Sequence, residues 1–149
     1  MLRLRLTLMV LCLLLLASVS ATAASAHRSM QSRDAIEEKV SKYARSFVGV
    51  PYRYGGSSPR SGFDCSGFVA FVYRHFGIRL PHYTYAQYGR GRRVSVRSLR
   101  PGDLVFFYGL GHVGLYVGHQ RFIHAPHTGA RVRVERFHYA GFAGARRLI

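Results

Sequence analysis

The segment Asp64-Cys65-Ser66-Gly67-Phe68-Val69 predicts the start of a helix with a cysteine in its first turn. Aspartate is a favoured N-cap residue, and apolar residues then recur at i, i+3, i+4, i+7 and i+11, which is typical of one face of a helix. This apolar stripe consists of Cys65, Phe68, Val69, Val72 and Phe76. The helix is expected to begin at Asp64 or Cys65, run to His75 and end at Gly77. Cys65 should then point toward the core from the helix N-terminus, a position that stabilises a thiolate.

Helical patterns also occur on both sides of this segment. Residues 34–48 place apolar side chains on one face, and the helix dipole favours the acidic residues in their first turn. Gly49 and Pro51 are expected to end that helix. A short helical turn is expected at residues 83–88.

The second half of the chain changes to the alternation that is typical of strands, with turn residues between them. The expected strands are residues 104–108, 112–117, 121–125 and 131–137, and residues 145–148 could add another. Helices followed by strands predict an α+β domain, with N-terminal helices packed on a C-terminal antiparallel sheet.

Residues 1–26 have the three parts of a secretory signal peptide. Arg3 and Arg5 form a basic start, residues 6–17 an apolar run, and Ala24-Ser25-Ala26 a small-residue cleavage site. The apolar run is shorter than the ~20 residues that a membrane-spanning helix needs, which favours cleavage over anchoring.

Cleavage near Ala26 would leave a flexible leader at residues 27–32 and one domain at residues 33–149, exported to the periplasm or cell envelope. Cys12 would be lost with the signal peptide. Cys65 would then have no partner for an internal disulfide, so it would be either a spare thiol or a reactive one.

The chain is strongly basic, with 22 lysines and arginines against 6 acidic residues and a formal net charge of +16. Without Arg3 and Arg5 the formal charge would still be +14. Such a charge attracts polyanions, namely nucleic acid, anionic lipid or an anionic envelope polymer. Export argues against nucleic acid, and the alternative is an ordinary solvated surface rich in arginine.

Two strand histidines could supply the imidazole that activates the thiol. If residues 118–120 form a three-residue hairpin loop, His124 lies opposite Gly114 and diagonal to His112 on the same face, roughly 7–8 Å away at Cα. Gly114 would leave room for a hydrogen bond between the rings, whereas a two-residue loop would put them on opposite faces. Cys65, docked over that sheet face by its helix, would complete a nucleophile, a base and an orienting residue.

These histidines also have other interpretations. A strand histidine is more often a satisfied core or rim residue than part of a triad. The loop residues His82 and His127 could line a cleft or lie on the surface. A zinc-dependent wall hydrolase that uses His112, His124 and one of these loop histidines is an alternative, although the chain has no H-E-x-x-H motif.

Seven segments, in chain order, carry a family resemblance. They are Gly49-Val50-Pro51-Tyr52-Arg53-Tyr54-Gly55-Gly56, Asp64-Cys65-Ser66-Gly67-Phe68-Val69, Leu80-Pro81, Gln87, Pro101-Gly102-Asp103-Leu104-Val105-Phe106-Phe107, His112-Val113-Gly114-Leu115-Tyr116 and Phe122-Ile123-His124-Ala125. Together they resemble the NlpC/P60 family of cell-wall peptide hydrolases, which have a papain-like cysteine-peptidase fold. The arrangement is similar to that of the small, single-domain murein endopeptidases of Gram-negative bacteria.

The resemblance implies a role for each matching residue. Cys65 would be the nucleophile, His112 the general base and His124 the polar residue that orients the base. Tyr52 matches a tyrosine that lies beside the nucleophile and, with the backbone N–H of Cys65, helps to bind the oxyanion.

Asp64 and Ser66 match residues that hold the free amine of a stem peptide in some relatives. For Asp64 the alternative is a helix cap.

The expected function is that of an exported cysteine endopeptidase that cleaves amide bonds in peptidoglycan stem peptides or crosslinks, acting as a monomer without metal or cofactor. An inactive envelope-binding module and a thiol acyltransferase or amidase remain alternatives. Both the D-alanyl–diaminopimelate crosslink and the γ-D-glutamyl–diaminopimelate bond suit the family, and the sequence does not choose between them.

Overall fold

The computed structural model describes residues 2–149, with side chains from residue 23 onward. The first helix, α1, runs Leu2–Arg45, so the helix expected at residues 34–48 is part of a much longer one. The chain forms two compact units, residues 1–35 and Ile36–Ile149, and α1 contributes to both. The sequence before Gly49 contains no glycine or proline, the residues that most often interrupt a helix, which explains why no break occurs at the expected start.

The expected leader at residues 27–32 is part of this helix, and its residues are exposed. The side chains of the apolar run at residues 6–17, Cys12 included, lie outside the described residues. Among the residues whose side chains the structure describes, no helix combines the length and the apolar character needed to cross a membrane. Cleavage near Ala26 stays a prediction.

The elements after α1 follow the expected order. Two α-helices, α2 (Cys65–His75) and α3 (Thr84–Tyr88), lie where the sequence places them, and a 3₁₀ turn, η1, spans Val96–Ser98. The strands are β1 (Ser57–Ser58), β2 (Gly62–Phe63), β3 (Arg92–Val94), β4 (Leu104–Phe107), β5 (His112–Tyr116), β6 (Arg121–His124), β7 (Arg133–Arg136) and β8 (Phe142–Arg147). The sequence pattern predicts neither β3 nor the β1–β2 pair, because two or three residues are too few to show an alternation.

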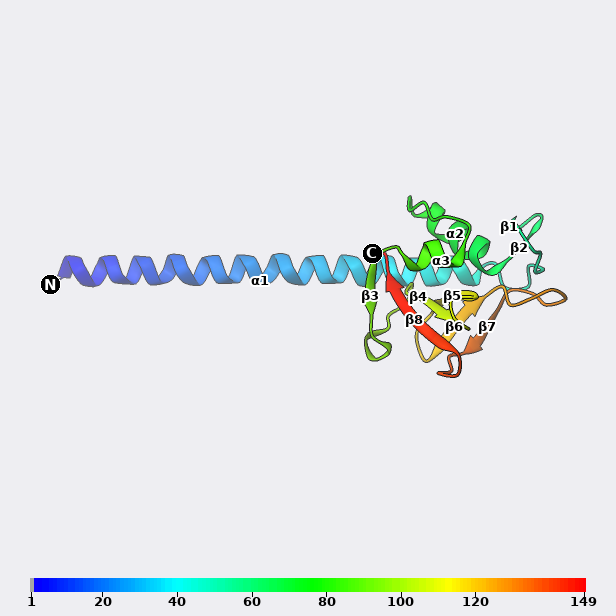
Figure 1. The fold of residues 1–149 in the computed structure, drawn as a ribbon. Helices are drawn as coiled ribbons and strands as arrows, with labels where there is room; N and C mark the ends of the chain where they lie inside the picture. The colour runs from blue at the N-terminus through cyan, green and yellow to red at the C-terminus, as the bar shows by residue number, and fades with distance from the viewer. Residues whose placement is uncertain (1) are drawn as a thin grey trace. The chain divides into compact units, whose positions relative to one another are not determined.

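Six strands form one antiparallel sheet in the order β3-β8-β4-β5-β6-β7. β4 to β7 pair in sequence, and β8 returns to pair with the free side of β4. α2 lies over β5 and β6, with α3 beside it (Figure 1). The predicted α+β class, with helices packed on an antiparallel sheet, is confirmed.

The sheet is apolar on both faces because each face covers a core of its own. The face under the helices packs against α1 and α2, and this core includes Val40, Ala44, Phe68, Val69, Val72, Leu104, Phe106, Val113, Leu115 and Ile123. The opposite face has a smaller core made of Val94, Val105, Phe107, Phe122, Phe137 and Ala145. All four residues of β4 are buried, since this central strand contributes to both cores.

A buried ion pair connects the start of β4 to the end of β8. The carboxylate of Asp103 accepts hydrogen bonds from Nε and a terminal nitrogen of Arg147, both at 2.7 Å. Asp103 is 1% exposed and Arg147 6% exposed. The Arg147 guanidinium also donates to the carbonyl of Ser98 at 2.8 Å, and the carboxylate of Glu37 lies 3.9 Å from its Nε.

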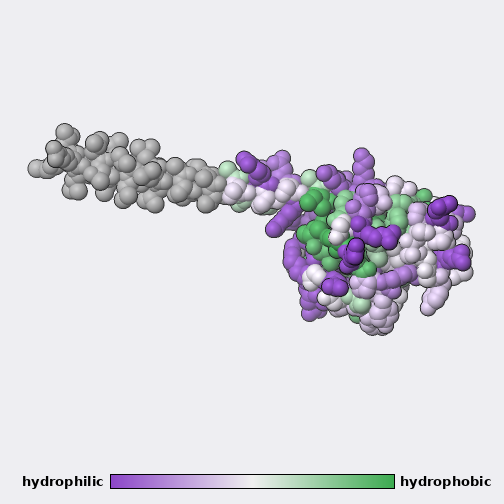
Figure 2. Space-filling model, turned by 90° about the horizontal axis from the view of Figure 1, so that it is seen from above, coloured by the Kyte–Doolittle hydropathy of each residue, from purple (hydrophilic) through white to green (hydrophobic). Residues whose placement is uncertain are grey.

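The surface is largely hydrophilic, and hydrophilic side chains surround a hydrophobic area on the face seen in Figure 2. Several arginines lie directly opposite one another on neighbouring strands, with Arg93 paired to Arg146 and Arg121 to Arg136. Like charges in directly opposite positions are destabilising, so these pairs do not help to hold the strands together.

Candidate active site

Cys65 is the first residue of α2 and has a free, partly exposed thiol. Burial raises the pKa of this thiol above its ordinary value, the nearby backbone N–H of Val113 opposes that effect, and the charge of Asp64 adds to it. The backbone N–H groups of Cys65 and Ser66 at the helix N-terminus also lower the pKa, as the sequence predicts, but burial outweighs them. The thiol is neutral at rest and needs a base.

The two strand histidines meet as expected. Nε2 of His112 lies 2.7 Å from Nδ1 of His124. The backbone N–H of Val117 donates to the carbonyl of Arg121 at 2.9 Å and closes the three-residue loop that puts both rings on one face. A Cβ atom on Gly114 would lie 3.1 Å from the Cβ of His124, so the absence of a side chain there does provide the space.

Burial lowers the pKa of His112 and of His124 to about 4 in each case. Both imidazoles are therefore neutral at pH 7, so one ring nitrogen of each carries a proton and the other has a lone pair. Because Nε2 of His112 is hydrogen-bonded to His124, Nδ1 of His112 is the nitrogen left to accept a proton from the thiol.

The pair of His112 and His124 makes the free energy of unfolding depend on pH. The unfolded histidines bind protons below about 6.5, whereas the folded ones resist protonation until about 4, so their contribution is complete above pH 6.5 and is lost as the pH falls to 4. One histidine shifted this far contributes on the order of 3 kcal/mol, so the melting temperature should fall by about 10 °C or more over this range. Melting curves from pH 7 to 4 test this, with His112→Gln expected to flatten the profile. A constant melting temperature would contradict it.

The side of the sheet on which the histidines lie differs from the expectation. Val113 packs with the core under α2, whereas His112 alternates to the opposite face, 6.4 Å from the ring of Phe107 between centroids. Cys65 is therefore not docked over the face of the histidine pair; it lies beside the backbone of β5 at the end where His112 begins the strand. Strand alternation predicts which residues share a face but not which face the helix covers.

Tyr52 lies close to the thiol, as the resemblance implies. Burial raises the pKa of its hydroxyl, and the charges of Cys65 and Asp64 raise it further, so the three groups are neighbours. The backbone N–H of Tyr52 donates to the carbonyl of Ala130 at 2.9 Å, which holds the loop before α2 against the loop after β6.

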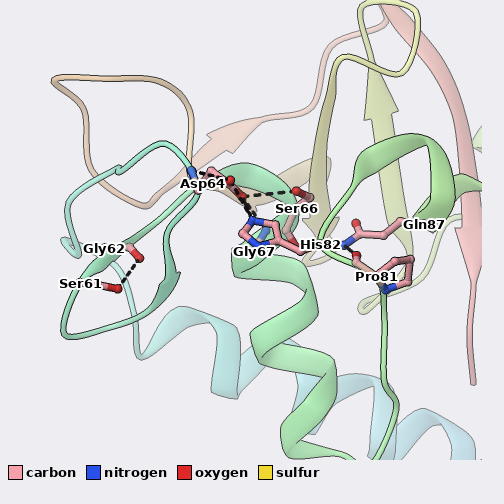
Figure 3. Close-up of polar contacts among 9 residues, drawn as sticks. Ser61, Gly62, Asp64, Ser66, Gly67, Pro81, His82 and Gln87 are labelled. Atoms are coloured by element: carbon pink, nitrogen blue, oxygen red, sulfur yellow. Dashed lines mark hydrogen bonds and ion pairs between the residues drawn. The ribbon is translucent and has the colours of Figure 1, made fainter.

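The carboxylate of Asp64 is fully engaged within the protein (Figure 3). Nε2 of His82 lies 2.7 and 2.8 Å from its two oxygens, and the backbone N–H groups of Gly67 and Gly55 donate to them at 2.7 and 3.0 Å. The hydroxyl of Ser66 lies 3.3 Å from the same carboxylate. These contacts match the helix-cap alternative. A substrate amine would have to displace His82, and binding of substrate by Asp64 and Ser66 stays a prediction.

Gln87 is a supporting residue to which the sequence assigns no role. It is completely buried, and its amide nitrogen donates to the carbonyls of Ser66 and Pro81 at 2.9 and 2.8 Å (Figure 3). Gln87 thereby connects the first turn of α2 with the loop in which His82 lies. The signal that the sequence offers for Gln87 is its place among the residues that carry the family resemblance.

No three histidine, cysteine or acidic side chains among the residues that the structure describes come together in a geometry that could hold a metal ion. His127 lines a cavity of about 350 Å³ together with His112 and His124, whereas His82 lies elsewhere and binds Asp64. Of the two loop histidines that a zinc site could use, His127 therefore lies near the pair and His82 does not.

The fold and the site define a class: an α+β domain with a cysteine at a helix N-terminus and a hydrogen-bonded pair of histidines on the adjoining sheet. The chain belongs to the NlpC/P60 family, whose model matches residues 49–146. The murein DD-endopeptidase MepH of Escherichia coli is 37% identical over 138 residues, which are 85% of this chain and 50% of MepH. The peptidoglycan endopeptidase RipA of Mycobacterium tuberculosis is 36% identical over 118 residues, 70% of this chain and 25% of RipA. This chain thus spans half or less of the length of these curated relatives.

Solved structures agree with this assignment. An NlpC/P60 family protein of Bacillus cereus superposes with a TM-score of 0.70 at 34% identity, over 74% of this chain and 39% of that one. Three similar structures are of RipA mutated at a cysteine, a histidine or a glutamate, with TM-scores of 0.65 to 0.68. The mutated histidine and glutamate are twelve residues apart, the separation of His112 and His124.

Proposed function

We propose that this protein is an exported cysteine endopeptidase that hydrolyses amide bonds in peptidoglycan stem peptides or crosslinks. The observation that carries the proposal is the 2.7 Å contact between His112 and His124 next to the strand residue whose N–H lies beside the Cys65 thiol. The names of MepH and RipA, and the equal spacing of the mutated residues in RipA, support the same substrate and site.

The reaction follows from the protonation states. Nδ1 of His112 accepts the thiol proton as the sulfur of Cys65 attacks the amide carbonyl, and the same imidazole then gives this proton to the leaving amine. Water, deprotonated by His112, hydrolyses the acyl-enzyme. The backbone N–H of Cys65 and the hydroxyl of Tyr52 would bind the oxyanion.

The proposal includes export after cleavage near Ala26 and contact of the basic surface with the anionic envelope. A neutral resting thiol and a neutral imidazole mean that the proton moves as the substrate is attacked, so substrate binding and proton transfer are coupled.

The test is mass spectrometry of sacculi and purified muropeptides after incubation with residues 27–149. New fragments that persist in chelator support a cysteine endopeptidase, and their masses identify the bond. Fragments lost on addition of chelator would assign the activity to a metal site instead. Binding to sacculi without fragments would favour an inactive envelope module, and release of that binding by salt would assign it to the basic surface.

A further inference from the structure

Glu135 on β7 adjoins the histidine pair from the side away from Cys65. Its Oε2 lies 3.2 Å from Nε2 of His124, and its Oε1 accepts a hydrogen bond from Nε of Arg133. His124 is 5% exposed, and its buried Nε2 has no well-aligned hydrogen bond, so the carboxylate of Glu135 at 3.2 Å is the charged group that it faces. Glu135 is one of only six acidic residues in the chain and the one carboxylate among the arginines of residues 131–136.

We propose that Glu135 is a positioning residue that fixes the tautomer of His124 and, through it, the tautomer of His112; the inference rests on the proposed function. A carboxylate only accepts hydrogen bonds, so it favours the His124 tautomer whose proton is on Nε2. Nδ1 of His124 then has a lone pair, and it can only accept the proton on Nε2 of His112. Nδ1 of His112 is left unprotonated, which is the form that a general base requires.

The opposite tautomer would prevent this chemistry. If Nδ1 of His124 carried the proton, it would donate to Nε2 of His112, and the proton of His112 would have to sit on Nδ1. His112 could then take no proton from Cys65. The carboxylate also faces the positive charge that His112 gains during the reaction, with His124 between them.

Glu135 is not needed to hold the ring of His124 in place. The ring packs on Phe122, with centroids 4.5 Å apart, and is hydrogen-bonded to His112 on its other side. Arg133 anchors the carboxylate. The exposed His127 and His138 line the same cavity, but their rings hydrogen-bond to backbone carbonyls and not to Glu135. Removal of the carboxylate should therefore change the proton arrangement more than the packing.

The test compares Glu135→Ala and Glu135→Gln with Glu38→Ala, which removes an exposed carboxylate from α1. Glu135→Ala should lower kcat for muropeptide cleavage by about 10- to 100-fold with KM within about twofold, by analogy with outer groups that orient a metal-binding histidine. Glu135→Gln retains an acceptor oxygen and should recover most of the loss. Glu38→Ala should match the unmodified protein.

The second readout is the ring ¹⁵N NMR spectrum of the two histidines in the Cys65→Ala protein. It should show protons on Nε2 of His112 and of His124, and a mixture of tautomers once Glu135→Ala is added. An unchanged tautomer with unchanged kcat in Glu135→Ala would overturn the inference, as would an unchanged tautomer alone, since a loss of kcat would then have another cause. If the unmodified protein cleaved nothing, the proposed function would fail, while the NMR spectra would still decide the role of Glu135.

Discussion

Replacement of Cys65 by alanine is expected to lower kcat for muropeptide cleavage by on the order of 10⁴-fold or more, because it removes the proposed nucleophile that forms the acyl-enzyme. His112→Ala should cost nearly as much, since a neutral thiol whose pKa is raised cannot attack without a base. The double variant should be no slower than the worse single one, because the two residues act as one unit. Steady-state kinetics on one purified muropeptide measure all three.

The matched control is His119→Ala, which removes an exposed histidine from the turn between β5 and β6 and should leave kcat unchanged. Circular dichroism confirms that each variant is folded. Cleavage that survived in Cys65→Ala would contradict the assignment of the nucleophile. Full activity in His112→Ala would contradict the assignment of the base.

The sequence predicts the local parts of this site well, because each depends on short-range geometry. The helix start at Cys65 follows from a cap and an apolar stripe. The contact between His112 and His124 follows from the loop length and the two-residue period of strands. Gly114 has a predictable role for the same reason, since its missing side chain leaves space beside His124.

The features that the sequence does not predict depend on long-range packing. Strand alternation predicts which residues of β5 share a face, but it does not say which of the two faces α2 covers. Burial, which raises the pKa of Cys65 and lowers that of His112, depends on neighbours from several elements. The sequence does not predict a role for Glu135, because its partner, His124, is on another strand and the length of the loop between β6 and β7 leaves the pairing of these strands open.

The segment Pro101-Gly102-Asp103 shows the same limit, since the sequence marks it as part of the resemblance but gives it no role. Asp103 pairs with Arg147, which is 44 residues away in the chain. The interaction connects the first residue before β4 to the last residue of β8, so it could only be recognised once the strand order β3-β8-β4-β5 was known. The Asp103–Arg147 pair stabilises the sheet on which His112 lies and takes no part in the proposed reaction.

Asp103→Ala is therefore expected to be the most destabilising of the substitutions considered, with a loss of about 3–5 kcal/mol in the free energy of unfolding. The reason is that Arg147 would keep its charge at 6% exposure and lose both of its 2.7 Å partners. Urea unfolding measures the loss, and an unchanged m-value would show that the unfolding transition is otherwise the same. The double variant Asp103→Leu with Arg147→Met should lose less than Asp103→Ala alone, because it removes both charges of the 2.7 Å pair instead of one.

Arg146→Met provides the matched control for this network. Arg146 is the neighbouring arginine of β8, but its guanidinium lies 4.3 Å from the ring centroid of Tyr88, and no carboxylate of the described residues pairs with it. Its loss should cost about 1 kcal/mol, the value of a cation–π contact. An Asp103→Ala protein within about 1 kcal/mol of the unmodified one would refute the unpaired-charge argument, because a buried guanidinium without its partner cannot be that stable. Below its melting temperature the Asp103→Ala protein should keep its kcat, since the ion pair stabilises the sheet and has no contact with Cys65 or His112.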